Sequence, residues 1–463
     1  MKCLFHTMLF FVFCSISFSC HNYKYRDMEL YPIMEDGLYG FIDTLGNKVI
    51  VPQYICVSNF SNHLALALVD TFYDDVIDST LYKRGLGYAQ EDFKVRCLNM
   101  RYGYINIEND FVVNPTLVRK IPVKPNYIAT NYDLEEYVSG LTFNEGLAIY
   151  QDPATRFYGY IDTFGNKKIL AQYYACQDFS SGKAGVKIRE LSDKENVSEN
   201  CFKWGYINKE GEKVSDFIFS YLTPCKNGRS FGTILSMTKD QESHPILRLN
   251  ENGEFEVEEP VDTSEESKWS IVSVLLDENG NIINNTLRSD YHYYIFGDDG
   301  VAVAERWGAE VLGPDIKFID RSGNYLEPRD VNNMHHSYIG IIPEDYHFSN
   351  ATPMQEGFAG IMISDGCYVF IDKNLNIYAP IDDEACDGII AFSNGLAGVC
   401  KNGKWGYVDK DFNLIIPLKY SMVYPAGNHL LRVFQKDETS HVVIESYINR
   451  TDSIVWQRVD NIQ

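Results

Sequence analysis

The chain has 463 residues, enough for about three average domains or for one large array of repeats. Aromatic residues make up 14% of it, and because such residues suit half-buried pleated surfaces, we expect an all-β chain rather than a disordered or coiled-coil one. The net charge of −23 repels phosphate backbones, and no basic stripe offsets it, so nucleic acid is excluded as a partner.

The N-terminal segment 1–19 has the pattern of a signal peptide. Lys2 is its only charge, an apolar stretch covers 8–13, and small polar residues follow, in a segment too short to span a bilayer. The ending Ser17-Phe18-Ser19-Cys20 resembles the lipobox of bacterial lipoproteins, which implies a lipid on Cys20. Ordinary secretion with cleavage near Ser19 is the alternative.

Three expectations about location follow from this segment. Residues 20–36 form a tether, and because no later apolar run is long enough to span a bilayer, the lipid is the only membrane anchor. The body is extracytoplasmic, in the cell envelope. The residues just after Cys20 lack an early acidic run, which favours a periplasm-facing lipoprotein.

One short segment recurs along the rest of the chain: an aromatic residue, Gly, a second aromatic residue, an aliphatic residue, and Asp or Asn. Its first two positions are Tyr39-Gly40, Tyr102-Gly103, Tyr158-Gly159, Trp204-Gly205 and Trp405-Gly406. Its last position is Asp43, Asn106, Asp162, Asn208, Asp320, Asp372 or Asp409, where the copies at Asp320 and Asp372 have Lys317 and Val369 in place of Gly. Two more degenerate copies are expected near 245–290, at Leu249-Asn250 and Leu276-Asp277.

A second recurring element has the pattern Phe-x-x-Gly-x-Ala, as in 143–148, 179–184 and 392–397. It begins 18 residues after the aliphatic residue of the first element in three copies, and we interpret this constant distance as one structural unit. Longer distances elsewhere predict insertions in loops, at 70–95, 118–140 and 190–200.

The residues of one repeat predict three short strands. Tyr39 to Asp43 alternate with a period of two, and Asp43-Thr-Leu-Gly46 has the Asx residue and the positive-φ Gly of a tight hairpin. The second strand is Val49-Ile-Val51, closed by Pro52, and the third carries the Gly-x-Ala pattern. Each repeat is then a meander of three or sometimes four strands that needs neighbours to bury its apolar face.

This pattern resembles the WG-repeat (KWG-repeat) family of bacterial β-repeat proteins, most clearly at Asn402-Gly-Lys-Trp-Gly-Tyr-Val-Asp409. The resemblance covers most of 28–463, including a half-copy at 447–456. It implies an all-β array of tandem β-meander repeats over 37–463, with about seven clear units. The units either close into a propeller-like ring, which we favour slightly, or stack as an open superhelical array.

Other motifs have simpler interpretations. Gly228-Arg-Ser230-Phe-Gly232 matches a nucleophile pattern but falls on the Gly-x-Ala strand, and Asp277-Glu-Asn279-Gly-Asn281 resembles a calcium loop but lacks its final Glu. His335-His336 are adjacent, so on a strand they face opposite ways and cannot hold one metal.

The acidic stretch 240–267 is interpreted as a solvated insertion, with a docking patch as the alternative. The eight cysteines beyond Cys20 contain no CxxC pair, so neither a zinc nor a redox motif is expected.

We therefore expect no catalytic residues, no cofactor and no metal, and we expect a non-enzymatic binding or scaffolding module whose insertions contact an envelope protein. The resemblance, too, implies binding rather than a reaction. The alternative is a carbohydrate-binding lipoprotein whose exposed aromatics, such as Tyr291, Tyr293 and Tyr294, hold a glycan. The repeated aromatic columns are interpreted as packing between repeats.

Overall fold

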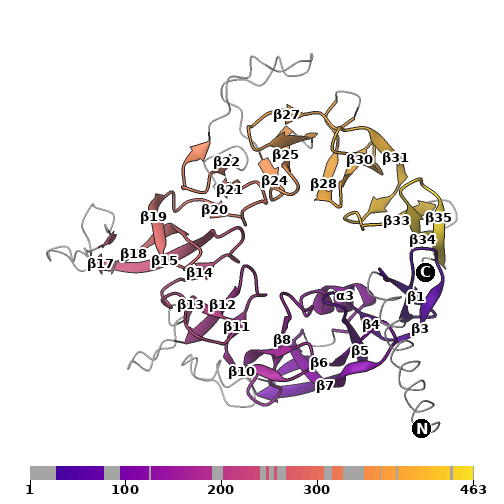
Figure 1. Cartoon of the computed structure of the whole chain (residues 1–463), viewed down its shortest axis with the longest axis horizontal. Coiled ribbons are helices and arrows are strands. Elements are labelled where there is room, and N and C mark those ends of the chain that lie inside the picture. The colour runs from indigo at the N-terminus through magenta and orange to yellow at the C-terminus, as the bar shows by residue number, and fades with distance from the viewer. Residues whose placement is uncertain are drawn as a thin grey trace, which may run out of the picture. The chain divides into compact units, whose positions relative to one another are not determined.

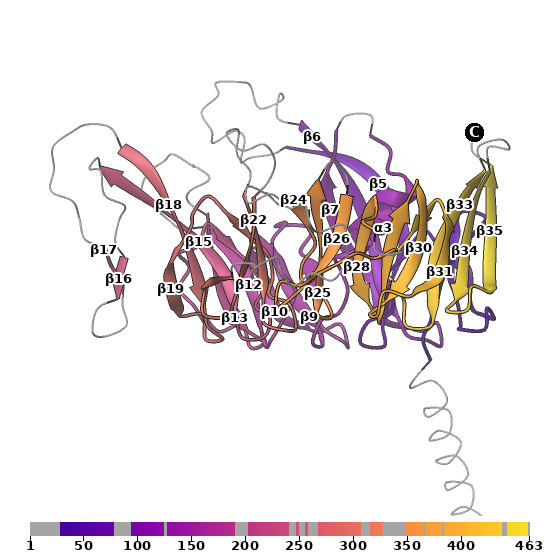
Figure 2. The ribbon, with the colours of Figure 1, turned by 90° about the horizontal axis from the view of Figure 1, so that it is seen from above.

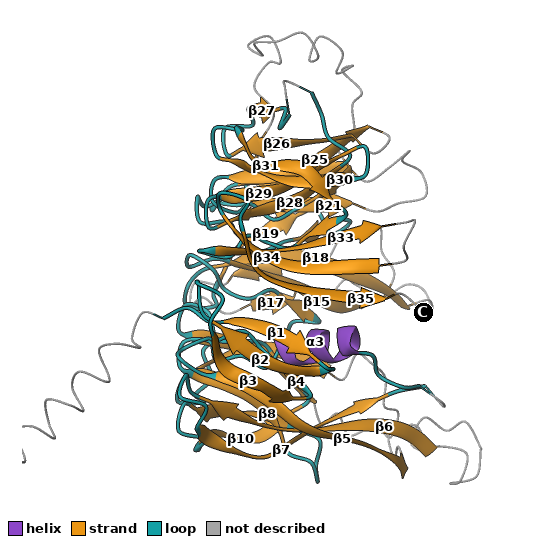
Figure 3. Cartoon of the chain, turned by 90° about the vertical axis from the view of Figure 1, so that its right-hand side faces the viewer, coloured by secondary structure: helices purple, strands orange, loops and turns teal. Residues whose placement is uncertain are grey.

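A computed structural model describes residues 28–77, 94–124, 127–189, 202–239, 247–249, 255–257, 267–306, 315–326, 349–364, 367–381, 384–437 and 442–461. Almost every element in these ranges is a β-strand, and all sheets are antiparallel (Figure 3). The predicted fold class, an all-β array of tandem meander repeats, is confirmed. Cys20, the signal peptide 1–19 and His335-His336 lie outside the described residues.

Nine of the described sheets have three or four strands each, and they follow one another along the chain (Figure 1). The first five contain, in sheet order, β1 (Tyr31–Glu35), β2 (Leu38–Ile42) and β3 (Lys48–Tyr54); β4 (Cys56–Val57), β5 (Ala65–Ile77), β6 (Lys94–Ile105) and β7 (Phe111–Pro122); β8 (Leu147–Gln151), β9 (Tyr158–Asp162) and β10 (Lys167–Tyr173); β11 (Ala175–Cys176), β12 (Lys183–Arg189) and β13 (Phe202–Asn208); β14 (Tyr221–Leu222), β15 (Ser230–Lys239), β18 (Ser267–Leu276) and β19 (Ile282–Leu287).

The last four sheets have four strands each. They contain β20 (His292–Tyr293), β21 (Ala302–Arg306), β22 (Asp315–Ile319) and β23 (Tyr325–Leu326); β24 (Ser349–Ala351), β25 (Phe358–Ser364), β26 (Cys367–Asp372) and β27 (Ile377–Tyr378); β28 (Gly388–Ser393), β29 (Leu396–Lys401), β30 (Lys404–Asp409) and β31 (Leu414–Tyr420); β32 (Met422–Val423), β33 (Leu430–Asp437), β34 (Val442–Asn449) and β35 (Ile454–Asn461).

A full sheet typically has a short first strand, the Gly-x-Ala element as its second strand, the aromatic-Gly element as its third, and a fourth strand, which carries a Pro in β3, β7 and β31. The Gly-x-Ala strand pairs with the aromatic-Gly strand that follows it, as Leu396 with Asp409 and Lys183 with Asn208. The predicted unit, in which that strand came last, was therefore wrong in phase. The constant distance of 18 residues therefore runs from the third strand of one sheet to the turn between the first and second strands of the next sheet.

Four further predictions are corrected by the strand pairing. Tyr31–Glu35 is not tether, because β1 pairs with β2 along its whole length. The expected copy near Leu249 is a separate hairpin of β16 (Leu247–Leu249) and β17 (Phe255–Val257) between β15 and β18. The expected half-copy at 447–456 belongs to the complete sheet β32–β35. The segment 118–140 is not only loop: β7 runs to Pro122, and α3 (Asn131–Ser139) follows.

The described chain divides into two compact units. One comprises described residues up to Asp75 together with Val95–Ala148 and Asp162–Asn166, and the other comprises Val76–Lys94, Ile149–Ile161 and the chain from Lys167 on. In the first unit, α3 begins at a capping box in which Thr130 Oγ1 accepts from the Asp133 amide, and it buries Leu134 and Val138.

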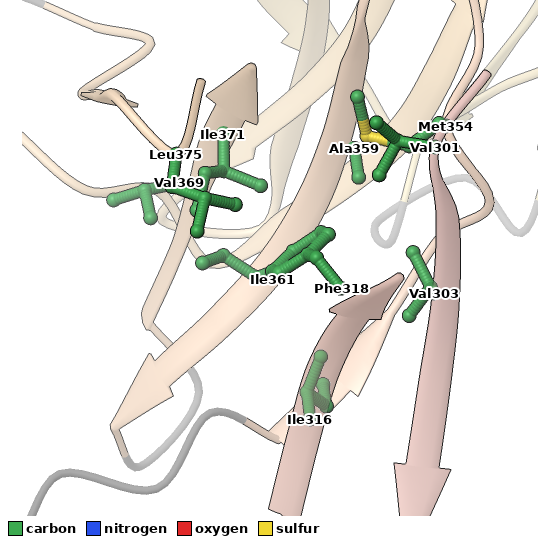
Figure 4. Packing of buried hydrophobic residues seen from close by; sticks show 10 residues of the cluster. All are labelled: Val301, Val303, Ile316, Phe318, Met354, Ala359, Ile361, Val369, Ile371 and Leu375. Atoms are coloured by element: carbon green, nitrogen blue, oxygen red, sulfur yellow. The ribbon is translucent and has the colours of Figure 1, made fainter. Parts of the chain in front are cut away.

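In the second unit, successive sheets bury apolar side chains between their faces. Val303 and Phe318 of the sheet β20–β23 pack against Ile361 and Ile371 of the sheet β24–β27, with Met354 closing one end of the cluster (Figure 4). The next interface buries Phe370, Phe392 and Val408 in the same way. A single meander has no such partner, so the repeats stabilise one another by stacking.

Candidate functional site

The Gly of the aromatic-Gly element lies directly beneath the fourth strand of its sheet. A Cβ on Gly40 would lie 2.3 Å from the Ile50 carbonyl oxygen, and one on Gly406 would lie 2.3 Å from that of Ile416. Gly103 and Gly159 have the same contact with Val113 and Ile169. Only Gly lets the backbones approach this closely.

The two copies that lack this Gly show why it is needed elsewhere. In the sheets that contain Lys317 and Val369, the fourth strands β23 and β27 have two residues each, and they pair with 318–319 and 370–371. The fourth strand therefore ends before it reaches Lys317 or Val369. Val369 lies between the pairs Phe370–Tyr378 and Tyr368–Cys386, where the covering segment is longer than the one over Gly40, and this leaves room for a side chain.

The Asx residue that ends the third strand holds the following turn together. Asp409 Oδ1 accepts hydrogen bonds from the amides of Asp411 at 3.0 Å and Asn413 at 2.8 Å. Burial raises the pKa of the Asp409 carboxyl, but the hydrogen bonds from Asn413 and Asp411 outweigh that effect and hold the pKa below its ordinary value. Equivalent bonds are made by Asp43, Asp162, Asp277, Asp320 and Asp372.

Two aromatic columns run through the repeats, and the second is the more deeply buried. In the first column, Tyr39 and Tyr102 are buried, whereas Tyr158, Trp204 and Trp405 are half-buried. The second column stands two residues later and is 0–3% exposed; it comprises Phe41, Tyr104, Tyr160, Tyr206, Phe318, Phe370, Tyr407 and Tyr447. The predicted packing role fits both columns, and it fits the second column best.

The second column also fixes the crossing from one sheet to the next. Tyr160 donates to the Gln177 carbonyl at 2.7 Å, and Tyr407 donates to that of Tyr424 at 2.6 Å, each 17 residues further on. Tyr160 also packs edge-on against Phe179, with ring centroids 4.8 Å apart. These contacts account for the constant spacing seen in the sequence, because the hydroxyl and the ring both hold the crossing at a fixed length.

The turn between the first and second strands bonds to the following sheet. Ser180 Oγ donates to the Cys225 carbonyl at 2.6 Å, and Ser393 Oγ donates to that of Ala426 at 3.0 Å. Gly182 and Gly395 in these turns have positive φ, as the pattern predicts. All the residues predicted as the repeat signature thus have places in the architecture, and they do not converge on one site.

The remaining sequence motifs are also structural. Ser230 begins β15 and is fully buried, so it is on a repeat strand and not on a nucleophile turn. Asp277 holds the same hairpin turn as the other Asx residues. Burial raises the pKa of the Cys386 thiol to about 12, which keeps this buried residue protonated at neutral pH and unreactive. Within the described ranges, no group of three or more His, Cys, Asp and Glu is placed to hold a metal ion.

Of the tyrosines predicted to bind a glycan, two are not exposed. Tyr291 and Tyr293 lie in the core between β15, β19 and β21. Tyr294 is half-buried and donates its hydroxyl to Glu305. The prediction of an exposed aromatic group was therefore wrong for Tyr291 and Tyr293, because neighbouring sheets cover them.

What does vary among the repeats is one edge of each sheet. We call it the variable edge: it carries the connection from the second to the third strand, such as 78–93, 152–157, 190–201, 240–266, 307–314 and 402–403, and the crossing from the fourth strand to the next sheet. The opposite edge, the fixed edge, carries the Asx turns, such as 43–47, 106–110, 162–166 and 409–413, and the turns from the first to the second strand.

The variable edge is longest in the sheets β4–β7 and β14–β19. β5, β6 and β7 have 13, 12 and 12 residues, against five to seven in the equivalent strands β8, β9 and β10, and β15 and β18 extend past the other strands of their sheet (Figure 2). Sequence reasoning placed the variation in loops. The structure shows that much of it is strand and helix.

Specific contacts hold the extended part of β5–β7 in place. Arg96 lies over the Tyr73 ring at 4.6 Å, and Tyr73 Oη accepts from the Ala129 amide just before α3. Asp74 accepts from Asn99 at 2.8 Å and forms an ion pair with Lys120 at 2.7 Å. The extension is thus a built surface, and it exposes Phe72 and Ile128.

Comparison with known proteins identifies the repeats. The family model described as "WG containing repeat" matches residues 39–70, 158–191, 204–231, 385–405 and 405–435. No curated protein matches the sequence. No helix among the described residues has both the length and the apolar character needed to cross a membrane.

The solved structures that match the chain share little sequence with it and have low TM-scores. A Quinonprotein alcohol dehydrogenase-like protein from Bacteroides thetaiotaomicron is 12% identical over 93% of this chain and 97% of its own, with a TM-score of 0.26. Porphyromonas gingivalis dipeptidyl peptidase 4 is 7% identical over 93% and 58%, with a TM-score of 0.38. The β-propeller domain of the Trilobed protease from Pyrococcus furiosus is 9% identical over 86% and 90%, with a TM-score of 0.28. None of the three assigns an activity or a partner to this chain.

Four of the family matches begin on the third strands β2, β9, β13 and β30, and each of these carries the aromatic-Gly pair under its fourth strand or the adjoining segment. These matched segments of the chain are therefore WG-containing repeats.

Proposed function

We propose that this protein is a non-enzymatic binding module that holds a protein partner at the variable edge of its sheets. The observation that carries the proposal is the separation of the two edges. The conserved geometry of the repeat uses the fixed edge, whereas strands, a helix and connections of unequal length are added only at the other edge. Such variable segments on a rigid scaffold are the usual location of binding residues.

The extension of β5–β7 is the strongest candidate within that edge. Its order comes from the Arg96–Tyr73 and Lys120–Asp74 contacts, so its exposed side chains are presented on a rigid support. Phe72 is 44% exposed and Ile128 is 78% exposed. Exposed apolar side chains beside ordered charged groups are typical of protein-binding surfaces.

We further propose that the protein is a lipoprotein of the bacterial envelope, anchored through Cys20. The support is the sequence pattern of 1–20 alone. Cys20→Ala should abolish labelling by a clickable fatty acid, and persistent labelling of the variant would contradict the lipobox assignment.

Site-specific photo-crosslinking in cells tests the binding surface. A benzoyl-phenylalanine at Phe72, on the variable edge, should give a discrete adduct whose partner is identified by mass spectrometry. The matched control is Phe164, another exposed phenylalanine at 77%, which lies in an Asx turn on the fixed edge. Adducts at Phe164 with none at Phe72 would overturn the assignment of the surface. A saccharide found on a glycan array would favour the carbohydrate-binding alternative.

A further inference from the structure

Glu305, at the variable-edge end of β21, has a buried carboxyl group in which one oxygen makes no hydrogen bond to a described residue. The residue is 2% exposed, although it is ionisable. Its Oε2 accepts a hydrogen bond from the Tyr294 hydroxyl at 2.5 Å. Its Oε1 is shielded from solvent and has no hydrogen-bond partner among the residues that the structure describes. Buried polar atoms nearly always have partners, so this atom calls for an explanation.

A second buried glutamate, whose Oε2 also lacks a hydrogen-bond partner of good geometry, differs from Glu305 in having counter-charges beside it. Glu445 is also 2% exposed, but Arg432 Nε lies 2.6 Å from its Oε1 and an Arg458 guanidinium nitrogen lies 2.9 Å from its Oε2. Within the described part of the chain no such cation accompanies Glu305. The adjacent Arg306 forms its ion pair with Asp290 at 3.0 Å instead. Burying a carboxylate without a counter-charge is unfavourable.

Three aromatic side chains, those of Tyr221, His292 and Tyr294, form a cluster on the strand that pairs with Glu305 and on the neighbouring sheet. His292 is the direct cross-strand neighbour of Glu305 and is exposed. Its ring lies edge-on to Tyr294 at 5.1 Å and is tilted against Tyr221 at 5.5 Å. Tyr221 is 42% exposed, so these rings lead from solvent towards the carboxyl group. On its other side, Glu305 is paired with the buried Ile316.

We propose that Glu305, together with Tyr221, His292 and Tyr294, binds a primary alkylammonium group, the group of a lysine side chain or of a free amine. An ammonium N–H supplies the hydrogen bond that Oε1 lacks, and its charge compensates the carboxylate. The aromatic faces attract the cation and its alkyl chain. A neutral alcohol would supply only the hydrogen bond, and a quaternary ammonium only the charge.

Entry of the ligand requires a small local change. Because Oε1 is covered, a side chain must move to admit the ammonium group, and we expect it to be His292, which is exposed and paired with Glu305 across the strands. The strongly acidic chain, with its net charge of −23, also raises the local concentration of cations. The proposal does not rest on the function proposed above, because it concerns the ligand of one group and not the partner of the whole edge.

Titration calorimetry with n-butylammonium chloride, at constant chloride concentration, tests the site. We expect saturable binding by the full chain and none of n-butanol, with tetramethylammonium at least ten-fold weaker. Glu305→Gln, which keeps the shape and removes the charge, should weaken n-butylammonium binding at least ten-fold. Tyr221→Ala changes a side chain that is partly exposed, so the fold is retained, and it should weaken binding about three-fold.

Glu356→Gln is the matched control. This carboxylate lies in another sheet and is paired with Lys410 at 3.0 Å, so its loss should leave the affinity unchanged. Equal binding of n-butylammonium by the wild type and Glu305→Gln, or equal binding of n-butanol, would show that Glu305 is only a buried structural group and would overturn the proposal.

A second arm distinguishes the two sources of the ammonium group. If the peptide acetyl-Gly-Lys-Gly-amide binds at least as tightly as n-butylammonium, the site takes a lysine of a polypeptide. If only n-butylammonium binds, it takes free amines.

Discussion

The two edges of each sheet follow different rules, although the same strands form both. At the fixed edge, an Asp or Asn at the end of the third strand bonds to the amides of a tight turn in sheet after sheet. At the variable edge, the connection between the second and third strands ranges from the two residues Asn402-Gly403 to the segment 240–266.

This difference indicates where the energy of folding resides. The turns, the buried tyrosines and the Ser–carbonyl bonds between sheets lie at the fixed edge or in the sheet interiors, and they recur because each repeat needs them. Among the described residues, the connections from the second to the third strand show no contact that recurs from sheet to sheet. Sequence change is therefore expected to cost most in the first group and least in the second.

The largest effect is expected at Gly406. Gly406→Ala places a Cβ against the backbone of β31, which cannot move aside without losing its pairing, so the free energy of unfolding should fall by about 2–3 kcal/mol. Lys317→Ala, at the equivalent position beyond the two paired residues of β23, is the control and should change it by less than about 0.5 kcal/mol. Urea denaturation measures both, and equal losses would refute the close-approach explanation.

A smaller loss is expected at the buried tyrosine of the same repeat. Tyr407→Phe keeps the ring and removes the hydroxyl that donates to the Tyr424 carbonyl, so that a carbonyl oxygen loses its partner. The free energy of unfolding should fall by about 1–2 kcal/mol. Tyr221→Phe, at a half-exposed tyrosine, should have no measurable effect. If both variants are as stable as the wild type, the hydroxyl does not hold the crossing.

Much of the fixed edge could be predicted from the sequence. The Asx residues and the positive-φ glycines Gly46 and Gly165 are where the pattern placed them, because a tight turn depends on residues that are close in sequence. The phase of the sheet could not be predicted. A tandem pattern repeats whichever strand is counted first, and only the pairing of Leu396 with Asp409 shows where a sheet begins.

The sites were less predictable than the turns. The Gly300-Val301-Ala302 copy of the second element was missed because it has Gly297 where other copies have Phe, although Gly300 has the expected positive φ. Glu305 has no local signature at all. Its isolation depends on β20 and β21 pairing and on Arg306 turning to Asp290, which no spacing in the sequence reveals.

Acid should destabilise the turns that are held by Asp more than those that are held by Asn. The pKa of Asp409 is lower in the folded chain than the ordinary value of 3.8, so this carboxylate contributes stability that is present above the unfolded-state pKa and lost as the pH falls through the folded-state pKa. Asp409→Asn should be close to neutral at pH 7, because Asn208 holds the same turn in its own repeat.

The measurement for this variant is the urea midpoint at neutral pH and at about pH 3. The wild type should lose more stability than Asp409→Asn between the two values. A parallel loss in both proteins would contradict the role given to the carboxylate.

The central claim is that the connections from the second to the third strand contribute little to the stability of the fold. Shortening one of these connections tests it most directly. Arg189 and Phe202 are directly paired across β12 and β13, as Lys401 and Lys404 are across β29 and β30, where Asn402-Gly403 joins the strands with positive φ at both residues. Residues 190–201 can therefore be replaced by Asn-Gly without changing the register. The account predicts that the free energy of unfolding of this variant, measured in urea, stays within about 1 kcal/mol of the wild type. A loss larger than that of Gly406→Ala would contradict it.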